Sequence, residues 1–146
     1  IIRNSMERMR ITHLANMPLR LLSGGQKQRA YIAQVIAHQA DLLVMDEPTS
    51  GLDAGGKELY LKAVNEELCR GASVVIATHD IHEEAAICDK VILLAHKVIA
   101  SGKPQEVITS ENLLQTFGII VNDRSHLRVI ETRKCLGPDD NSPHKH

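Results

Sequence analysis

The sequence predicts an α/β fold in which helices cover a parallel sheet. Two short, mainly apolar runs, residues 42–45 and 73–78, have the length of buried strands. Segments 26–38 and 57–70 repeat apolar residues at intervals of three and four, as amphipathic helices do. The order helix, strand, helix, strand is the one from which α/β sheets are built.

Length and composition limit the class of protein. The chain has 146 residues, of which 43% are hydrophobic, and this predicts a single globular domain. Its only aromatic residues are Tyr31, Tyr60 and Phe117, so the core is expected to be aliphatic. The chain has 17 basic and 18 acidic residues, so its charges nearly cancel. We therefore expect no overall electrostatic field that would attract nucleic acid or anionic lipid to this protein. The longest apolar run, residues 91–95, is far shorter than the ~20 residues of a membrane helix.

The first part of the chain predicts two helices around one strand. Residues 5–14 form a charged helical stretch, and residues 16–22, with Pro18, form a connector. Ser23 is expected to cap the helix at 26–38. The run 42–45 then suits a strand buried on both faces of a parallel sheet.

The next helix, at residues 57–70, turns four side chains inward and has a glycine, Gly71, at its C-terminal cap. The inward side chains are Tyr60, Ala63, Val64 and Leu68. Beyond the buried strand at 73–78 the pattern weakens, and Thr109 or Ser110 is a candidate cap. We expect short helices at 83–88, 104–108 and 111–117, a strand pair at 91–94 and 98–100, and disorder from about residue 136.

Polar residues follow both predicted buried strands. Asp46 and Glu47 end the first strand, and His79 and Asp80 follow the second. In open parallel sheets ligands bind beyond the carboxyl ends of the strands. A carboxylate in that position suits Mg²⁺ on a nucleotide, and a second carboxylate beside it can position water. The pattern indicates a phosphate site.

Four motifs across residues 22–80 resemble those of ATP-binding cassette (ABC) ATPases, in the family's order. Leu22, Ser23, Gly24, Gly25 and Gln26 are similar to the signature motif. The segment 42–47 resembles the Walker B strand, 48–53 the D-loop and 77–80 the switch-histidine loop. The resemblance implies a P-loop NTPase-like ABC nucleotide-binding domain, here incomplete, with ATP and Mg²⁺ as cofactors.

The resemblance also implies a role for each residue at the strand ends. Asp46 would hold Mg²⁺, directly or through water. Glu47 would be the general base that polarises the attacking water. His79 would donate to the γ-phosphate and orient Glu47.

A second set of residues is implied to act across a dimer. Ser23, Gly24 and Gly25 precede a helix, whose exposed N–H groups suit an anion, and with Gln26 they would face ATP held by the opposite subunit. Asp53 would couple the two nucleotide sites, and it can also serve as the N-cap of the following helix. The implied partners are a second ATPase subunit, in a head-to-tail homodimer, and membrane-spanning permease subunits.

The phosphate-binding loop of such ATPases, G-x-x-x-x-G-K-[ST], does not occur in this chain. The nearest string ends at Lys57, but Glu58 replaces the required hydroxyl and no buried strand precedes it. ATP binding in cis is therefore expected to be weak, and the chain alone inactive. In the family fold the absent phosphate-loop strand lies beside the switch-histidine strand, so we expect uncovered sheet edges.

The resemblance divides the chain into three parts. Residues 1–22 would end a helical subdomain, residues 23–120 would hold the ATPase core, and residues 121–146 would be an extension. The function implied is that of a subunit coupling ATP hydrolysis to transport. Residues 102–118 resemble the ends of ATPases of zinc, manganese, iron or iron-chelate importers. Two alternatives stay open: a truncated half-site that only dimerises with an intact subunit, and a soluble ABC ATPase not involved in transport.

Two observations bear on the compartment. The three cysteines are an odd number without C-x-x-C spacing, which favours a reducing cytoplasm over a disulfide framework. The family resemblance likewise implies a cytoplasmic protein, peripheral on the inner face of the cell membrane.

Overall fold

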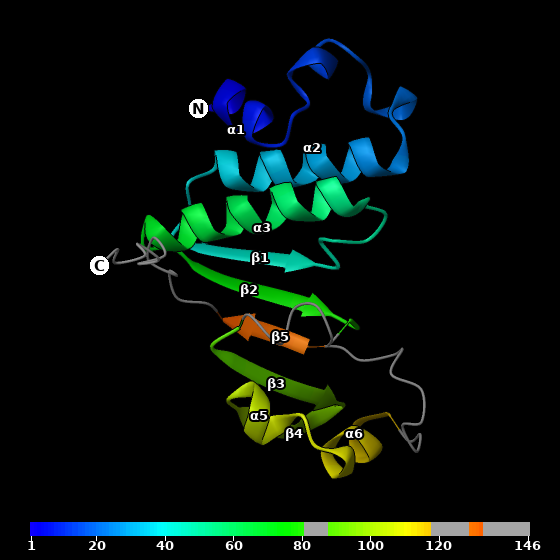
Figure 1. Cartoon of the computed structure of the whole chain (residues 1–146), viewed down its shortest axis with the longest axis vertical. Coiled ribbons are helices and arrows are strands. Elements are labelled where there is room, and N and C mark those ends of the chain that lie inside the picture. The colour runs from blue at the N-terminus through cyan, green and yellow to red at the C-terminus, as the bar shows by residue number, and fades with distance from the viewer. Residues whose placement is uncertain (81–87, 118–128, 133–146) are drawn as a thin grey trace, which may run out of the picture.

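The computed structural model describes residues 1–80 and 88–117, and the backbone of residues 129–132. Helices and strands alternate from α2 to β2, and Figure 1 shows α1, α2 and α3 at one end of the sheet and α5 and α6 at the other. The elements are α1 (Ile2–Arg8), 3₁₀ turns at Thr12–Leu14 and Leu19–Leu21, α2 (Gly24–Ala37), β1 (Leu42–Asp46), α3 (Ala54–Cys69), β2 (Ser73–Thr78), β3 (Lys90–Ala95), β4 (Lys97–Gly102), α5 (Pro104–Val107), α6 (Ser110–Phe117) and β5 (Val129–Thr132).

The sheet is mixed, with the order β1-β2-β5-β3-β4. Among the strands that the structure describes, only β1 and β2 pair in parallel, and the crossover helix α3 joins them. The expected strand pair, now β3 and β4, is confirmed and antiparallel. A single residue, His96, separates the two strands and has a φ of 56°. Because so short a connection can only reverse the chain, the parallel arrangement cannot continue there.

The strand β5 was not predicted, and it corrects one expectation. It pairs antiparallel with β2 on one side and with β3 on the other. The edge of the switch-histidine strand is therefore covered, and the prediction that it would be left open is wrong. Only four residues form β5, too few to show a period in a sequence.

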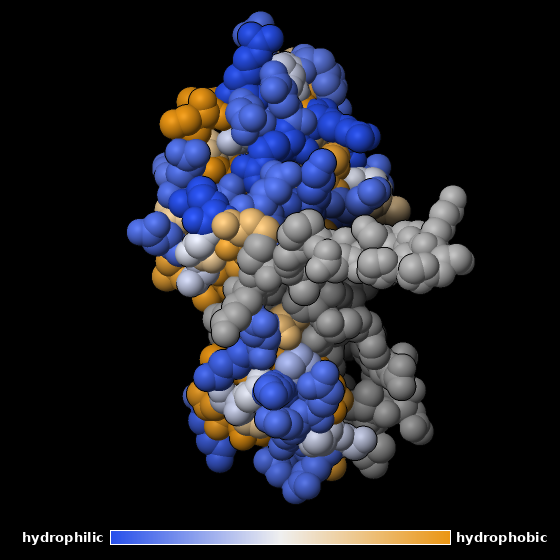
Figure 2. All heavy atoms as spheres, turned by 60° about the vertical axis from the view of Figure 1, so that its left-hand side comes forward, coloured by the Kyte–Doolittle hydropathy of each residue, from blue (hydrophilic) through white to orange (hydrophobic). Residues whose placement is uncertain are grey.

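Strand β1 is buried on one face rather than two. Leu43 and Met45 are buried beneath the helices, whereas Leu42 and Val44 are 55% and 65% exposed. The expectation of burial on both faces is wrong, because burial alternates along β1 and only the side that carries Leu43 and Met45 packs into the core. Figure 2 shows that apolar side chains form separate patches on a largely hydrophilic surface.

The two long helices form as predicted, and the first helix is shorter than predicted. All four side chains expected to point inward from α3 are buried: Tyr60, Ala63, Val64 and Leu68. After α3, Gly71 has a φ of 100°, which the absence of a Cβ permits. The first helix, α1, ends at Arg8 because Arg10 takes a left-handed φ of 52°.

Two apolar clusters fill the interior. The larger joins α1, α2, α3, β1 and β2, and Tyr60 is its only aromatic member among the described residues. The smaller lies between β3 and the helices α5 and α6, around Val91, Leu93 and Val107. The second of these helices is capped as expected, since Thr109 Oγ1 accepts from the Asn112 N–H. The aliphatic core predicted from composition is confirmed in this part of the chain.

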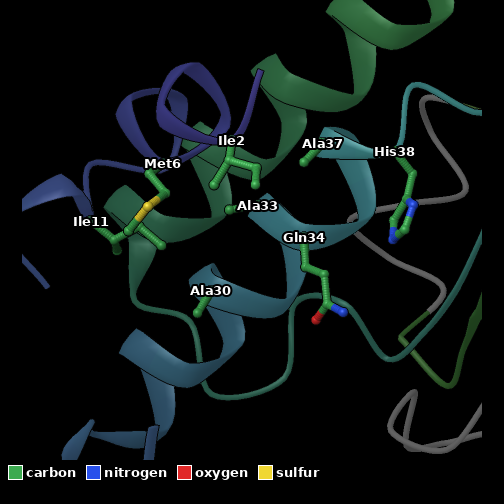
Figure 3. Close-up of a pocket in the computed structure, with 8 residues that line it drawn as sticks. All are labelled: Ile2, Met6, Ile11, Ala30, Ala33, Gln34, Ala37 and His38. Atoms are coloured by element: carbon green, nitrogen blue, oxygen red, sulfur yellow. The ribbon is translucent and has the colours of Figure 1, made fainter. Parts of the chain in front are cut away.

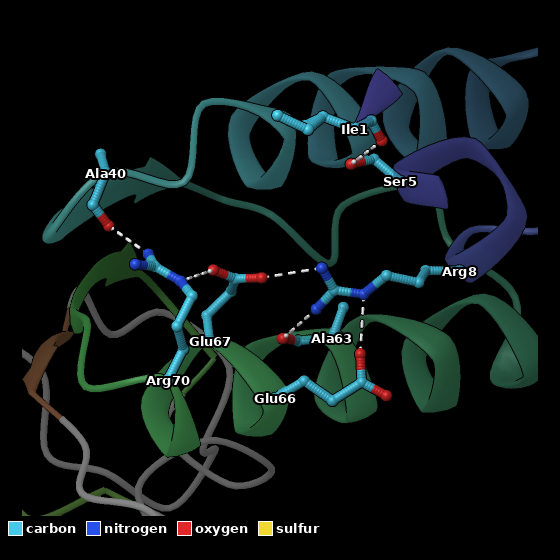
Figure 4. Close-up of polar contacts among 8 residues, drawn as sticks. All are labelled: Ile1, Ser5, Arg8, Ala40, Ala63, Glu66, Glu67 and Arg70. Carbon is cyan, nitrogen blue, oxygen red and sulfur yellow. Dashed lines mark hydrogen bonds and ion pairs between the residues drawn. The ribbon is translucent and has the colours of Figure 1, made fainter. Parts of the chain in front are cut away.

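A buried carboxylate, Glu67, ties α1 to the end of α3 (Figure 4). Its oxygens accept from Arg8 at 2.7 Å and from Arg70 at 2.9 Å. Each arginine also donates to a backbone carbonyl, Arg8 to Ala63 and Arg70 to Ala40. Burial raises the pKa of Glu67, but the two guanidinium groups outweigh it and hold that pKa below its ordinary value.

Some expectations fall outside the described residues or concern single side chains. Residues 83–87 of the predicted helix at 83–88, and the tail from about residue 136, lie outside the described part of the chain. In the described part of the chain, Cys69 is disulfide-bonded. The cysteine count therefore does not predict the state of Cys69.

The exposed face of β1 predicts self-association of the isolated chain. Leu42 and Val44 are apolar side chains on a strand at the end of the sheet, where edges promote pairing between chains. We expect Val44→Lys to lower the apparent mass measured by sedimentation, while the apolar control Val44→Ile leaves it unchanged. Equal masses for the parent chain and Val44→Lys would contradict this prediction.

The buried Glu67 predicts loss of stability in acid. Because its pKa is lowered by folding, its contribution is complete above the ordinary value of about 4.5 and disappears as pH falls through the folded value. We expect Glu67→Gln to lower the free energy of unfolding by about 1–3 kcal/mol at pH 7, and by less at pH 3. Urea unfolding at both pH values measures this. The exposed Glu58 of α3 supplies the control Glu58→Gln, and an equal loss in both variants would argue against the role of Glu67.

Candidate functional site

The carboxyl ends of β1 and β2 lie side by side, as predicted. The parallel register places Asp46 opposite Ala77, and the Glu47 N–H donates to the Ala77 carbonyl at 2.8 Å. Glu47 itself takes a left-handed φ of 46°, uncommon for a residue with a side chain. The chain therefore turns sharply as it leaves the sheet.

This turn brings Glu47 into contact with His79, which follows β2. Glu47 Oε1 lies 2.5 Å from His79 Nδ1, and the two side chains are 26% and 54% exposed. An ionised carboxylate can only accept a hydrogen bond, so the Nδ1–H of the imidazole donates. The pair is thus a carboxylate held in one orientation and open to solvent.

Asp46, the other predicted carboxylate, ends β1 and is exposed. Within residues 1–80 and 88–117, no three histidine, cysteine or carboxylate side chains are grouped in a way that could hold a metal ion. Mg²⁺ is usually held by one or two carboxylates together with substrate phosphates and water. The single carboxylate of Asp46 fits an ion that arrives with a nucleotide, and does not fit a metal bound by protein alone.

The N-terminus of α2 is a capping box built by Ser23 and Gln26. The Gln26 N–H donates to Ser23 Oγ at 3.3 Å, and the Ser23 N–H donates to Gln26 Oε1 at 2.9 Å. The predicted cap is confirmed. A Cβ built on Gly24 would meet open space, whereas one on Gly25 would lie 3.0 Å from the Gly51 carbonyl. Gly25 therefore lets the turn after β1 approach α2, and Gly24 is free to face a ligand.

Asp53 caps α3 and pairs with Arg29 of α2. Its Oδ1 accepts from the Gly56 N–H and from the Arg29 guanidinium, both at 2.7 Å. The backbone N–H of Gly56, and then Arg29, lower the pKa of Asp53 below its ordinary value. The structural role expected for Asp53 as a helix cap is confirmed.

These residues line one open cleft of 400 Å³ between the starts of α2 and α3. Its walls are Ser23, Gly25, Gln26, Arg29, Gly51 and Asp53. The cleft therefore gathers four of the predicted site residues, Ser23, Gly25, Gln26 and Asp53. Gly24 is not part of its lining, and Asp46, Glu47 and His79 form a second group at the strand ends.

Sequence reasoning missed two polar residues on the inner face of α2. Gln28 donates to the Pro48 carbonyl at 2.9 Å, and Arg29 donates to Asp53 Oδ1 at 2.7 Å. Each lies four residues before a buried side chain, Ile32 or Ala33, and so on the same face of the helix. That spacing was the signal that could have identified both as inward-facing.

An apolar groove lies elsewhere, between α1 and α2 (Figure 3). It measures 430 Å³, and Met6 and Ile11 face Ala30 and Ala33 across it. Its lining contains no carboxylate, and His38 is its one titratable side chain. None of the described helices is both long enough and apolar enough to cross a bilayer.

Comparison with known proteins identifies the family. Residues 2–50 match the family model for ABC transporter proteins. The chelated iron transport system membrane protein YfeB of Yersinia pestis is 33% identical over 143 residues, which cover 98% of this chain and 46% of YfeB. The manganese transport system ATP-binding protein MntA of Synechocystis is 34% identical over 118 residues, covering 81% and 45%.

The fold agrees with these sequence matches. The structure of cbiO1 from Clostridium perfringens, part of the ABC transporter complex cbiONQ, superposes with a TM-score of 0.60 at 35% identity. The superposition covers 78% of this chain and 46% of cbiO1. The chain spans about half the length of the curated relatives that it matches. The matched family model, the sequence relatives and the shared fold together place this chain in the ABC transporter family of ATP-binding proteins.

Proposed function

We propose that this chain supplies the catalytic strand ends and the signature helix of an ATP-hydrolysing subunit of an ABC transporter. The contact between Glu47 and His79, beside Asp46 at the ends of paired parallel strands, supports the proposal most directly. Such an edge is where α/β sheets bind their ligands. A carboxylate oriented by an imidazole and open to solvent is suited to activating water.

In the proposed reaction, Glu47 accepts a proton from the water that attacks the γ-phosphorus of ATP. His79, 54% exposed, holds Glu47 through Nδ1 and keeps its other ring nitrogen available to the γ-phosphate. The bond between the γ-phosphorus and the β,γ-bridging oxygen breaks, and ADP leaves with that oxygen. Neither residue forms a covalent bond with phosphate.

Asp46 would carry the carboxylate that meets Mg²⁺ on the nucleotide. The ion, when bound, neutralises charge that develops on the phosphate oxygens. The exposed position of Asp46 at the end of β1 leaves its oxygens available for this contact. The phosphate-binding loop itself would come from residues outside this sequence, which holds no G-x-x-x-x-G-K-[ST] motif.

The cleft at the start of α2 would bind the γ-phosphate of ATP held by a second subunit. Ser23, Gly24, Gly25 and Gln26 present the helix N-terminus, which favours an anion. Asp53 would couple this cleft to the opposite nucleotide site while it caps α3. The assembly proposed is a head-to-tail homodimer in which each subunit completes the site of the other.

The cargo proposed is a divalent metal ion or a metal chelate, taken into the cell. The proposal is supported by the names of two relatives, a chelated iron system and a manganese system. The subunit would lie in the cytoplasm on the inner face of the membrane, bound to membrane-spanning permease subunits.

The test is ATP hydrolysis by a chimera that joins the part of YfeB preceding its matched region to this chain. We expect the parent chimera to hydrolyse ATP and Glu47→Gln to lower kcat by about 10²-fold or more, because the general base is lost. Binding of ATP, measured by equilibrium dialysis, should persist in that variant. Phosphate release gives kcat.

The exposed Glu111 at the start of α6 supplies the control, and Glu111→Gln should hydrolyse ATP at the parent rate. Retained turnover in Glu47→Gln would contradict the assignment of Glu47. A chimera without turnover that nevertheless restores hydrolysis to an intact subunit lacking its own signature serine would favour the half-site alternative. A rate of ATP hydrolysis that is the same with and without permease subunits would favour a soluble ATPase.

A further inference from the structure

One side chain of the signature helix reaches the backbone of the proposed general base. Gln28 Nε2 donates to the Pro48 carbonyl at 2.9 Å and to the Glu47 carbonyl at 3.3 Å. Gln28 lies one turn before Ile32, on the face of α2 that packs inward. A single amide thus bridges α2 to the two residues that follow β1.

The segment that Gln28 contacts needs external support. Glu47 has a φ of 46°, a conformation that costs free energy for a residue with a side chain. The Glu47 carbonyl also accepts from the Ser50 N–H at 3.1 Å, which closes a tight turn. Pro48 is fully buried and has no N–H of its own. Because Pro48 is buried, its carbonyl needs a hydrogen-bond donor from the protein, and Gln28 Nε2 supplies one.

Glu47 is consequently held from three sides. Its N–H donates to the Ala77 carbonyl at the end of β2, and its carboxylate accepts from His79. The third restraint, on its carbonyl and on the next one, comes from Gln28. The first two restraints lie on the β2 side, whereas Gln28 holds this turn against α2.

We propose that Gln28 is a positioning residue that keeps the Glu47 carboxylate in place for water activation. The inference rests on the proposed function of Glu47. Without the two donated hydrogen bonds, the turn loses its restraint against α2 and the strained backbone of Glu47 can relax. A displaced carboxylate then meets the attacking water in the wrong geometry. Displacements of about 1 Å can cost about 10²-fold in rate.

The test compares Gln28→Met with Gln34→Met in the chimera described above. Methionine keeps the length and helix preference of glutamine but donates no hydrogen bond. Gln34 is an exposed glutamine on the same helix, so its substitution controls for the change of residue type. We expect Gln28→Met to lower kcat by about tenfold or more with KM for ATP unchanged, and Gln34→Met to retain the parent kcat.

A second measurement reports on the conformation of the turn at Glu47 and does not depend on activity. Amide hydrogen exchange of Glu47 and the imidazole resonances of His79 report on the turn. Gln28→Met should speed exchange at Glu47 and shift the His79 resonances, while the amides in the middle of α3 keep their protection. Gln34→Met should change neither signal.

The outcomes separate this inference from the proposed function. If the parent chimera hydrolyses ATP and Glu47→Gln does not, an unchanged kcat in Gln28→Met overturns the positioning role alone. A loss of kcat that only matches a loss of folded protein, seen as general loss of amide protection, also overturns it. If the parent chimera is inactive, the proposed function fails, and unchanged Glu47 exchange in Gln28→Met would then refute the positioning geometry as well.

Discussion

The parallel pairing of β1 with β2 is the constraint on which the site depends. Parallel strands place their carboxyl ends at the same edge, and the register that sets Asp46 opposite Ala77 brings Glu47 to His79. Such strands also require a crossover, which α3 provides, and the start of α3 is then fixed at that edge by its cap, Asp53. One pairing therefore positions the strand-end carboxylates, the histidine and the second helix N-terminus together.

The signature helix α2 contributes through both its end and its side. Its N-terminus, with Ser23 and Gln26 in a capping box, lines the open cleft. Its inner face packs on the core through Ile32 and Ile36, but one turn earlier that face carries polar residues. These polar groups contact the loop after β1 and the cap of α3. Side-chain hydrogen bonds of this kind fix geometry more than they add stability, because each replaces a bond to water.

The charged side chains of this molecule act through contacts with near neighbours, and the net charge of the chain is only −1. Asp53 and Glu67 both have lowered pKa values, and both accept from an arginine of a different helix. Glu67 is buried, so removal of Arg8 would leave only Arg70 to compensate its charge. Arg8 thereby anchors α1, a helix of seven residues that would be marginal alone, to the body of the domain.

The sequence by itself determined the local elements and the polar residues that follow the two parallel strands. Periodicity predicted α2 and α3, apolar runs predicted β1 and β2, and Ser23, Gly71 and Thr109 were correctly identified at helix ends, because these signals depend on near neighbours in the chain. The tertiary structure alone decided the insertion of β5 between β2 and β3 and the exposure of Val44. It also decided the left-handed turn at Glu47 and the reach of Gln28 across nearly twenty residues of sequence to that turn. Pairing, burial and long-range hydrogen bonds depend on what packs opposite each residue, and a pattern along one chain does not contain that information.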